Sequence, residues 1–261
     1  MQLANSSTLS DILDDIYFNA KINASYFGTV TEGKIDANGN PYDLLRIVNK
    51  IYKQAQDEIR AVNEDFFLEI STLDLVADTG GTYPNEYPLP FDFEKIKQIQ
   101  VALQPVDKTA PLVSEYQKCN LIGWGAITDP SYQDFTTPTC VMFDKYFHFF
   151  PLPASTLLPV TRGLKCFYIP LQADLANNTD VPNIFANYHD VITWGSLIDV
   201  ATRLGDNNLL KIASEMYNKR KEEMRAYASS YILDIQPEYT EGQDQLGGWD
   251  FSWNNRNLNG M

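Results

Sequence analysis

The residues that most often carry catalysis or bind metals are sparse in this chain. It has two histidines, His148 and His189, among 261 residues. Zinc sites usually bring histidines together at short spacings on one strand or helix. Neither histidine has a partner at an HxH or HxxxH spacing, so we expect no metal site. A Ser-His-Asp triad assembles from distant segments and stays open as an alternative, although the chain has no GxSxG motif.

Sequence motifs for cofactors and for reactive sulfur are also absent. No GxxxxGK[ST] or GxGxxG motif occurs, so we expect no nucleotide and no other cofactor. The three cysteines, Cys119, Cys140 and Cys166, are far apart and include no CxxC pair. This pattern favours reduced thiols in a protein made in a cytoplasm.

Carboxylates are the one abundant reactive group, with 34 Asp and Glu residues. A glycosidase needs no sequence motif for its two carboxylates, so such a site stays open. Pairs such as Asp14-Asp15 and Glu222-Glu223 nevertheless fall on predicted helix exteriors, where a solvated face explains them. We therefore expect no catalytic residues and no enzyme activity.

The chain carries a net charge of −14, which opposes binding to phosphate backbones and anionic lipid. The charge fits either simple solubility or a surface past which DNA slides without adhering. The N-terminus lacks the basic and apolar regions of a signal peptide, and no run approaches the about 18 apolar residues of a membrane span. We expect no contact with a membrane.

Two helices are predicted before residue 65. The first covers 8–20, where Thr8 and Asp11 have the spacing of a capping box. The second covers 41–62 and opens at Pro41, a residue suited to a first helical turn. Its apolar side chains recur at helical spacing, which is typical of an amphipathic packing helix.

A β-rich block follows, from about 65 to about 171. Strand-like segments are 96–103, 141–150 and 164–169, because they are dense in β-branched and aromatic residues. The segments KYFHFFPLPAS and GLKCFYIPL are predicted to form a β-hairpin with a long loop.

Helical periodicity returns at residue 184. We predict a helix over 184–204, capped by Asn183 and ended by Gly205, and another over 208–232. The short connection predicts that the two helices form an antiparallel hairpin. The Met and Tyr residues of 208–232 are expected in its core.

The tail from 236 onward has too few aliphatic residues for a core of its own. Its WDFSW motif alternates apolar and polar residues, as an extended strand does. Aromatic and Arg side chains commonly anchor interfaces. Packing of the tail on its own domain is the alternative. We predict a partner-binding arm whose contact residues are Trp249, Phe251, Trp253 and Arg256.

These elements predict an α+β fold: a bundle of about four helices with a β-rich insertion between helices two and three. An extended C-terminal arm completes the chain. The predicted divisions are 1–64 for the N-terminal helices, 65–180 for the insertion, 181–235 for the helical hairpin and 236–261 for the arm.

The order of four features resembles the head–tail adaptor (connector) proteins of tailed bacteriophages, in the form with a β-rich insertion. The first is the helix NPYDLLRIVNKIYKQAQDEI, and the second is YPLPFDFEKIKQIQV at 87–101. The third is YFHFFPLPASTLLPVTRGLKCFYIPLQADL. The fourth is Val181-Pro182 followed by a helix and then LLKIASEMYNKRKEEMRAY. Together these features cover about 190 residues.

The resemblance implies a structural virion protein at the head–tail interface, assembled in the host cytoplasm. Such adaptors form rings, commonly of twelve copies, beneath the portal. The implied partners are the portal protein, tail or neck proteins and further copies of the chain. DNA would pass through the lumen without specific binding, and mixed charges on 208–232 could set the register between copies.

Two other functions stay open at this point. One is another phage neck component, such as a stopper or tail-completion protein. The other is a carbohydrate-binding or hydrolytic module built on the β block. Sugar binding would use exposed aromatic side chains such as those of Trp124, Tyr132 and Tyr146.

Overall fold

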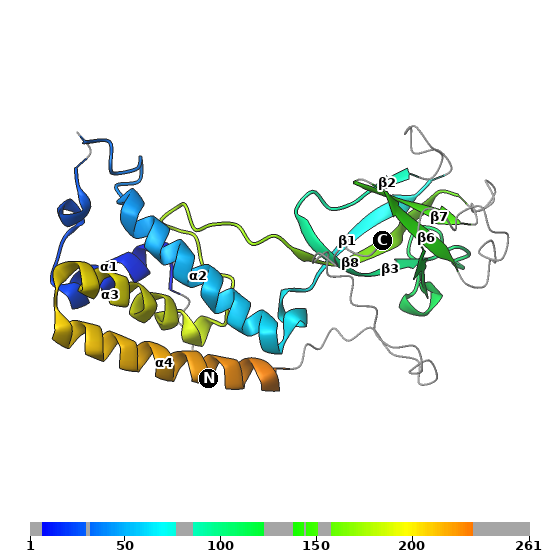
Figure 1. Cartoon of the computed structure of the whole chain (residues 1–261). Helices are drawn as coiled ribbons and strands as arrows, with labels where there is room; N and C mark the ends of the chain where they lie inside the picture. The colour runs from blue at the N-terminus through cyan, green and yellow to red at the C-terminus, as the bar shows by residue number, and fades with distance from the viewer. Residues whose placement is uncertain are drawn as a thin grey trace, which may run out of the picture. The chain divides into compact units, whose positions relative to one another are not determined.

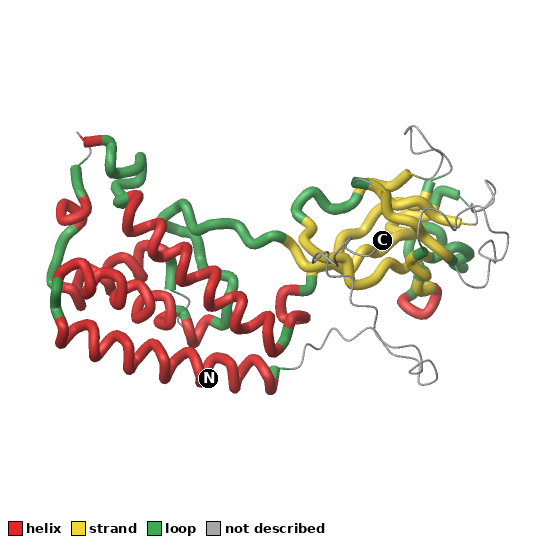
Figure 2. The backbone as a smooth tube through the Cα atoms, in the orientation of Figure 1, coloured by secondary structure: helices red, strands yellow, loops and turns green. Residues whose placement is uncertain are grey.

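The fold is α+β, as predicted from the sequence. The computed structural model describes residues 7–29, 32–76, 86–122, 138–143, 145–150 and 158–231. Within these ranges, residues up to 66 and from 172 onward form a helical unit, and residues 67–171 form a β unit. Figure 1 labels the α-helices and most strands of the two units, and Figure 2 separates helices from strands by colour.

The capping box predicted at Thr8 is confirmed. Helix α1 spans Leu9–Ala20, and the Thr8 hydroxyl accepts a hydrogen bond from the Asp11 amide at 3.3 Å. In return the Thr8 amide donates to the Asp11 carboxylate at 2.8 Å, so two amides of the first turn are satisfied. The helix ends at Lys21, which adopts the left-handed conformation usual at helix C-termini. A 3₁₀ helix, η1 (Ala24–Phe27), follows.

Helix α2 spans Tyr42–Val62 and confirms the predicted amphipathic helix. Its apolar residues face the interior of the helical unit, whereas most of its charged residues are exposed: Asp43, Arg46, Lys50, Lys53 and Asp57. The buried side chains are those of Leu44, Ile47, Val48, Ile51, Tyr52, Ala55, Gln56 and Ile59. Another 3₁₀ helix, η3 (Glu64–Phe67), follows α2.

The helix predicted from residue 184 begins later than expected. Helix α3 spans Asp190–Leu204, preceded by a 3₁₀ helix, η8 (Ala186–Tyr188). Asn183 is not its cap, because the N-cap position is taken by His189; the backbone amide of Asn183 donates to the Tyr52 hydroxyl of α2 at 2.9 Å, and its side chain donates to Gln172. Ile184 and Phe185 are buried in an irregular segment, so their apolar pattern reflects tertiary packing and not a helical period.

Helix α4 spans Asn207–Ser230 and lies beside α3. Gly205 is in the left-handed conformation and ends α3, as predicted. Asp206 then caps α4, because its carboxylate accepts from the amides of Asn208 and Leu209 at 3.0 and 2.9 Å. The prediction for the core is correct in part: Met224 is buried, whereas Met216 and Tyr217 are half-buried.

The helical unit is held together by contacts of α3 with α1, α2 and α4, and of α2 with α4. Gly195, on α3, permits a close approach of the neighbouring helices. A Cβ atom at this position would lie 2.5 Å from Cγ2 of Ile51 and 2.9 Å from the ring of Tyr217. Glycine is therefore required by packing here, in the middle of a helix where it is otherwise unfavourable.

The β unit contains two four-stranded sheets. Strands β1 (Glu69–Leu75), β8 (Val160–Pro170), β3 (Phe93–Val101) and β4 (Gln117–Lys118) form the first sheet in the order β1-β8-β3-β4. Strands β2 (Glu86–Pro88), β7 (Tyr146–Phe150), β6 (Thr139–Phe143) and β5 (Asn120–Leu121) form the second in the order β2-β7-β6-β5. A short 3₁₀ helix, η4 (Val113–Glu115), precedes β4.

Two strand predictions are wrong. The single strand predicted over 141–150 is a hairpin of β6 and β7, with Phe143 opposite Tyr146. Its FDKY sequence has no Gly or Pro to signal the reversal. The hairpin predicted between β7 and β8 is also wrong, because β7 pairs with β2 and β6 while β8 pairs with β1 and β3.

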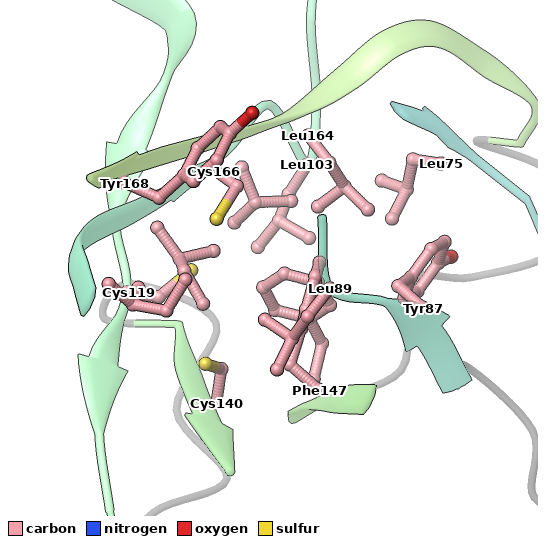
Figure 3. Close-up of a cluster of buried hydrophobic side chains, with 14 of the residues drawn as sticks. Leu75, Tyr87, Leu89, Leu103, Cys119, Cys140, Phe147, Leu164, Cys166 and Tyr168 are labelled. Carbon is pink, nitrogen blue, oxygen red and sulfur yellow. The ribbon is translucent and has the colours of Figure 1, made fainter. Parts of the chain in front are cut away.

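The core of the β unit combines side chains from both sheets. Figure 3 shows Cys166 and Tyr168 of β8 on one side and Phe147 of β7 on the other. The rings of Phe147 and Phe149 meet edge to face with centroids 5.1 Å apart, an arrangement that aromatic pairs favour. The Tyr87 hydroxyl donates to the Val76 carbonyl at 2.9 Å, so this buried polar group is satisfied.

The Gly195→Ala substitution tests the close approach of the helices. Overpacking costs about 1–3 kcal/mol, and the gain in helix propensity offsets about 1 kcal/mol of it. We expect a net destabilisation of up to about 2 kcal/mol in urea unfolding followed by circular dichroism. The Ile51→Leu substitution removes the opposing Cγ2 methyl. The cost of Gly195→Ala should therefore be smaller in a chain that already carries Ile51→Leu than in the wild-type chain. Greater stability of Gly195→Ala would contradict the packing argument.

Candidate interaction surfaces

The predicted arm lies outside the described residues. Trp249, Phe251, Trp253 and Arg256 all fall beyond residue 231, and their role as a partner-binding arm stays a prediction. Two of the aromatic residues considered for sugar binding, Trp124 and Tyr132, also fall outside the described ranges. The third, Tyr146, is partly exposed on β7, opposite Pro88 of β2.

The three cysteines are buried in the core of the β unit and are not paired with one another. Burial raises the pKa of the Cys166 thiol to about 12 and raises the pKa values of Cys119 and Cys140 well above their usual range. Because the thiolate is the reactive form of cysteine, these thiols are poor nucleophiles at neutral pH. They act as small apolar core residues.

Both histidines are buried in the interior of their units. His189 lies just before α3, and its Nδ1 is 3.0 Å from the Ser7 amide nitrogen. It thereby ties the start of α1 to the start of α3. His148 lies on β7 and faces Glu86 and Val141 in the strand register. Among the described residues, no group of three or more His, Cys, Asp or Glu side chains is placed to hold a metal ion.

Much of the charge on α4 is used inside the helical unit. The Arg220 guanidinium donates to both carboxylate oxygens of Asp190, at 2.7 and 3.0 Å, and to the Asn187 carbonyl at 2.7 Å. It also donates to Glu223 at 2.7 Å. These bonds, led by those to Asp190, raise the pKa of Arg220, so it stays charged at all relevant pH values. Bidentate pairs of this kind fix geometry as well as charge.

Glu58 of α2 forms ion pairs with two further cationic side chains of α4. Its carboxylate oxygens lie 3.4 Å from Nζ of Lys221 and 3.1 Å from a guanidinium nitrogen of Arg225. The charges of the NKRKEEMR segment therefore set the register between α2, α3 and α4 of one chain. They are less available to set the register between copies than the sequence pattern suggested.

A first exposed apolar surface is the loop 105–115 of the β unit, here named the clamped loop. Glu115 closes it: one carboxylate oxygen accepts from the Val106 amide and the other from the Leu112 amide, both at 2.7 Å. The Asp107 carboxylate accepts from the Thr109 amide at 2.8 Å and orders the turn between them. The loop is thus held by polar bonds and not by a core of its own.

The clamped loop directs its aliphatic side chains outward. Val106 is 94% exposed, Leu112 62% and Val113 71%. The loop is anchored to the beginning of β8, because the Thr161 amide donates to the Lys108 carbonyl at 2.8 Å. Just beyond its end, the Tyr116 hydroxyl donates to the Arg162 carbonyl at 2.7 Å.

A second exposed surface, with a mainly polar lining, lies where α1 passes into η1. Lys21, Ile22, Asn23, Ser25 and Tyr26 line a shallow, open hollow of about 480 Å³, here named the α1–η1 hollow. Tyr26 in this lining is 45% exposed, and Phe18, which lies outside the lining on the last turn of α1, is 82% exposed.

Sequence reasoning missed both surfaces. For the clamped loop, the available signal was the aliphatic residues that follow Pro105 and Pro111. For the α1–η1 hollow, it was the absence of Asp and Glu from residues 16 to 31. Neither signal distinguishes an exposed apolar residue from a buried one without tertiary structure.

The two histidines predict a pH dependence of stability. Burial lowers the pKa of His189 and of His148 in the folded chain. The unfolded chain therefore binds more protons below about pH 6.5, so stability is complete above that pH and falls as the pH drops toward the folded pKa values.

We expect wild-type unfolding to need less urea at about pH 5.5 than at about pH 7.5, and the difference to shrink in His189→Gln. Far-ultraviolet circular dichroism is the measurement, because the described α-helices all lie in the helical unit with His189. His148→Gln, in the β unit, is the matched control. Equal pH differences in wild type and His189→Gln would contradict this role.

Among the described residues, no helix is both long enough and apolar enough to cross a bilayer. A search of curated proteins finds no match to this chain. The family model of the SU10 adaptor protein, in contrast, matches residues 8–238, from the cap of α1 to beyond the end of α4. This match confirms the resemblance deduced from the order of the helices and the β block. The chain belongs to the SU10 adaptor protein family, a family of phage head–tail adaptors.

Proposed function

We propose that this phage adaptor forms a ring, of twelve copies, beneath the portal and links the capsid vertex to the tail. The observation that carries the proposal is the family match over residues 8–238, which includes both the helical unit and the β block. The adaptor role itself places the protein in the virion as a structural component of tail assembly.

The chemistry of the described residues supports a role in assembly. The thiols are buried and protonated, and Arg220, Lys221 and Arg225 hold helices of the same chain together. Such an arrangement stabilises the helical unit. Its function then depends on the surfaces that it presents to other proteins.

The net negative charge of the chain would have a role in such a ring. Twelve copies that each carry −14 would surround the channel with an excess of negative charge. Repulsion between this charge and the DNA phosphates would let DNA pass through the lumen without specific binding. Among the described acidic residues, Asp11, Asp14 and Asp15 are exposed together on α1.

The proposed partners are the portal protein, tail or neck proteins and neighbouring copies of the chain. We assign the arm of residues 236–261 to one of these contacts, with Trp249, Phe251, Trp253 and Arg256 as its anchors. Its alternating aromatic residues suit an extended segment that pairs with a partner through its main chain.

The molar mass of the purified full chain tests the ring. We expect light scattering after size exclusion to show a ring of copies, or a monomer that assembles when the portal protein is added. A molar mass above that of one chain in the absence of portal would show self-assembly directly. The same portal-free sample is the reference for assembly that requires portal. A monomer that ignores the portal at every concentration would overturn the proposal.

Truncation after Gln236 tests the arm separately. We expect the shortened chain to fold, because the described helices and strands end at Ser230, and to fail to join the assembly. Circular dichroism checks the folding, and sedimentation with portal checks the incorporation. A second variant, the full chain with Trp249 and Trp253 both changed to Ser, should show the same defect in incorporation. Normal incorporation of the truncated chain would refute the assignment of the arm.

A further inference from the structure

We propose that the arm of one copy adds as an extra strand to the β1 edge of a neighbouring copy, through its WDFSW motif at residues 249–253. This inference rests on the proposed function, in which the arm makes one of the assembly contacts, and it names the surface that receives the arm. Every copy carries both the arm and the edge, which are different surfaces. A contact of this kind propagates from copy to copy and closes into a ring when the rotation permits.

The first argument is the open main-chain edge of β1. In the first sheet β1 pairs with β8 alone. Within the described ranges, no other strand or loop forms main-chain hydrogen bonds with its second edge. The N–H and C=O groups of an open edge can pair with another extended segment, which is the basis of recognition by strand addition. The ligand that fits such an edge is therefore an extended peptide.

The other three sheet edges are protected against strand addition, whereas β1 is not. Strands β4 and β5 have two residues each, and β2 has three and includes Pro88. Very short edge strands, proline and lysine are common protections of sheet edges. Strand β1 has seven residues and includes neither Pro nor Lys. Residues 69–73 pair with β8 in unbroken register, so this edge can accept an added strand as long as the WDFSW motif.

The side chains of β1 fit an aromatic partner strand. Leu73 packs against the core of the β unit, so the alternation of a strand places Ile70 and Thr72 on the opposite face. Both side chains are exposed there, Ile70 by 42%. In an extended WDFSW segment the three aromatic rings share one face. Pairs of aromatic and β-branched side chains across neighbouring strands are stabilising, so the rings would cover Ile70 and Thr72.

The length of chain beyond α4 favours the edge of a neighbouring copy. Asn63 donates to the Tyr231 carbonyl at 2.8 Å, and the ring centroids of Phe66 and Tyr231 are 5.6 Å apart. The chain therefore leaves α4 beside the segment that leads into its own β1, which begins three residues after Phe66. Pairing with that β1 would need only a short connection. Residues 232–248 instead supply a spacer that spans up to about 60 Å when extended, enough to reach another copy.

Strand addition also suits contacts between acidic chains. Copies with a net charge of −14 repel one another, so a contact that depends on opposite charges is difficult to form. Main-chain hydrogen bonds and aromatic contacts have no such requirement. The two acids of β1 are engaged by β8: Glu69 accepts from the Tyr168 hydroxyl at 3.2 Å, and Asp74 accepts from the Arg162 amide at 2.7 Å.

Cross-linking of mixed single-cysteine chains tests the contact. One full-length chain carries Thr72→Cys and the other Ser252→Cys, and the two are mixed under assembling conditions, with portal if assembly requires it. The reagent is a bismaleimide with a spacer longer than the separation of paired strands, about 5 Å. The native cysteines are buried, so the engineered thiols react first. We expect cross-linked dimers from the mixture and none from either chain alone.

Thr202 supplies the matched control, since it is an exposed threonine on α3. Thr202→Cys mixed with Ser252→Cys should give no cross-link.

A lysine on the edge strand gives a second measurement. Ile70→Lys should raise the concentration needed for half assembly by about tenfold or more, because a charge on this face opposes the added aromatic strand. Thr72→Lys should act in the same direction. Ile212→Lys is the matched control, because Ile212 is an exposed aliphatic residue on α4, and it should leave assembly unchanged. Circular dichroism checks that each variant folds.

The outcomes separate this contact from the ring itself. Assembly that requires the arm but gives no cross-link to Thr72→Cys would place the arm on the portal or a tail protein, and would overturn the edge contact while the ring stands. Normal assembly of both lysine variants would do the same. An intramolecular cross-link in a dilute chain that carries both cysteines would show that the arm pairs with its own β1, and would also overturn the proposal. If the wild-type chain never assembles, the ring fails and this contact with it.

Discussion

The helical unit depends on joining two stretches of chain that are separated by the entire β block. Asn49 of α2 illustrates the join: its amide donates to the Leu175 carbonyl at 3.0 Å, and its carbonyl oxygen accepts from the Leu175 amide at 2.8 Å. At the far end of α2, Asn63 donates to the carbonyls of Ala228 and Tyr231. The entropic cost of closing a loop grows only slowly with its length, so an intervening block of this size is tolerated.

The parts of the fold that were predicted correctly are those that local interactions decide. Thr8 and Asp11 form their capping box within one turn, and Gly205 ends α3 through its own backbone conformation. The start of α3 was placed wrongly, because Asn183 donates to Tyr52, a residue 131 positions away, and does not cap a helix. Competition from distant partners of this kind leaves no trace in a local pattern.

The pairing of the strands shows the same limit of prediction from local sequence patterns. The segments of β3 and β8 were recognised from their β-branched and aromatic residues, but their partners were not, because such residues suit any pleated, half-buried surface. The candidate surfaces were harder still to predict from the sequence. The clamped loop depends on Glu115 bonding to Val106, nine residues away, and a glutamate in a polar loop has no feature that announces this role. The arm, predicted from Trp249, Phe251 and Trp253, lies outside the described residues and stays a prediction.

The distribution of charge links the fold to the adaptor role. The cations of α4 pair mainly with acids of the same helical unit, so that Arg220, Lys221 and Arg225 neutralise Asp190, Glu223 and Glu58. Exposed pairs contribute little stability individually, but Arg220 makes four hydrogen bonds at once and orients the start of α3. Each pair uses one acid and one base, so the surplus of 34 Asp and Glu over 20 Lys and Arg remains as an acidic excess.

The buried thiols have a consequence for the life of the particle. A protein of a virion meets aerated medium whenever the particle is outside a cell. Oxidation of cysteine follows thiolate character and exposure, and the sulfurs of Cys119, Cys140 and Cys166 are both shielded and protonated. The core of the β unit therefore resists the formation of sulfenic acids and stray disulfides in such a medium.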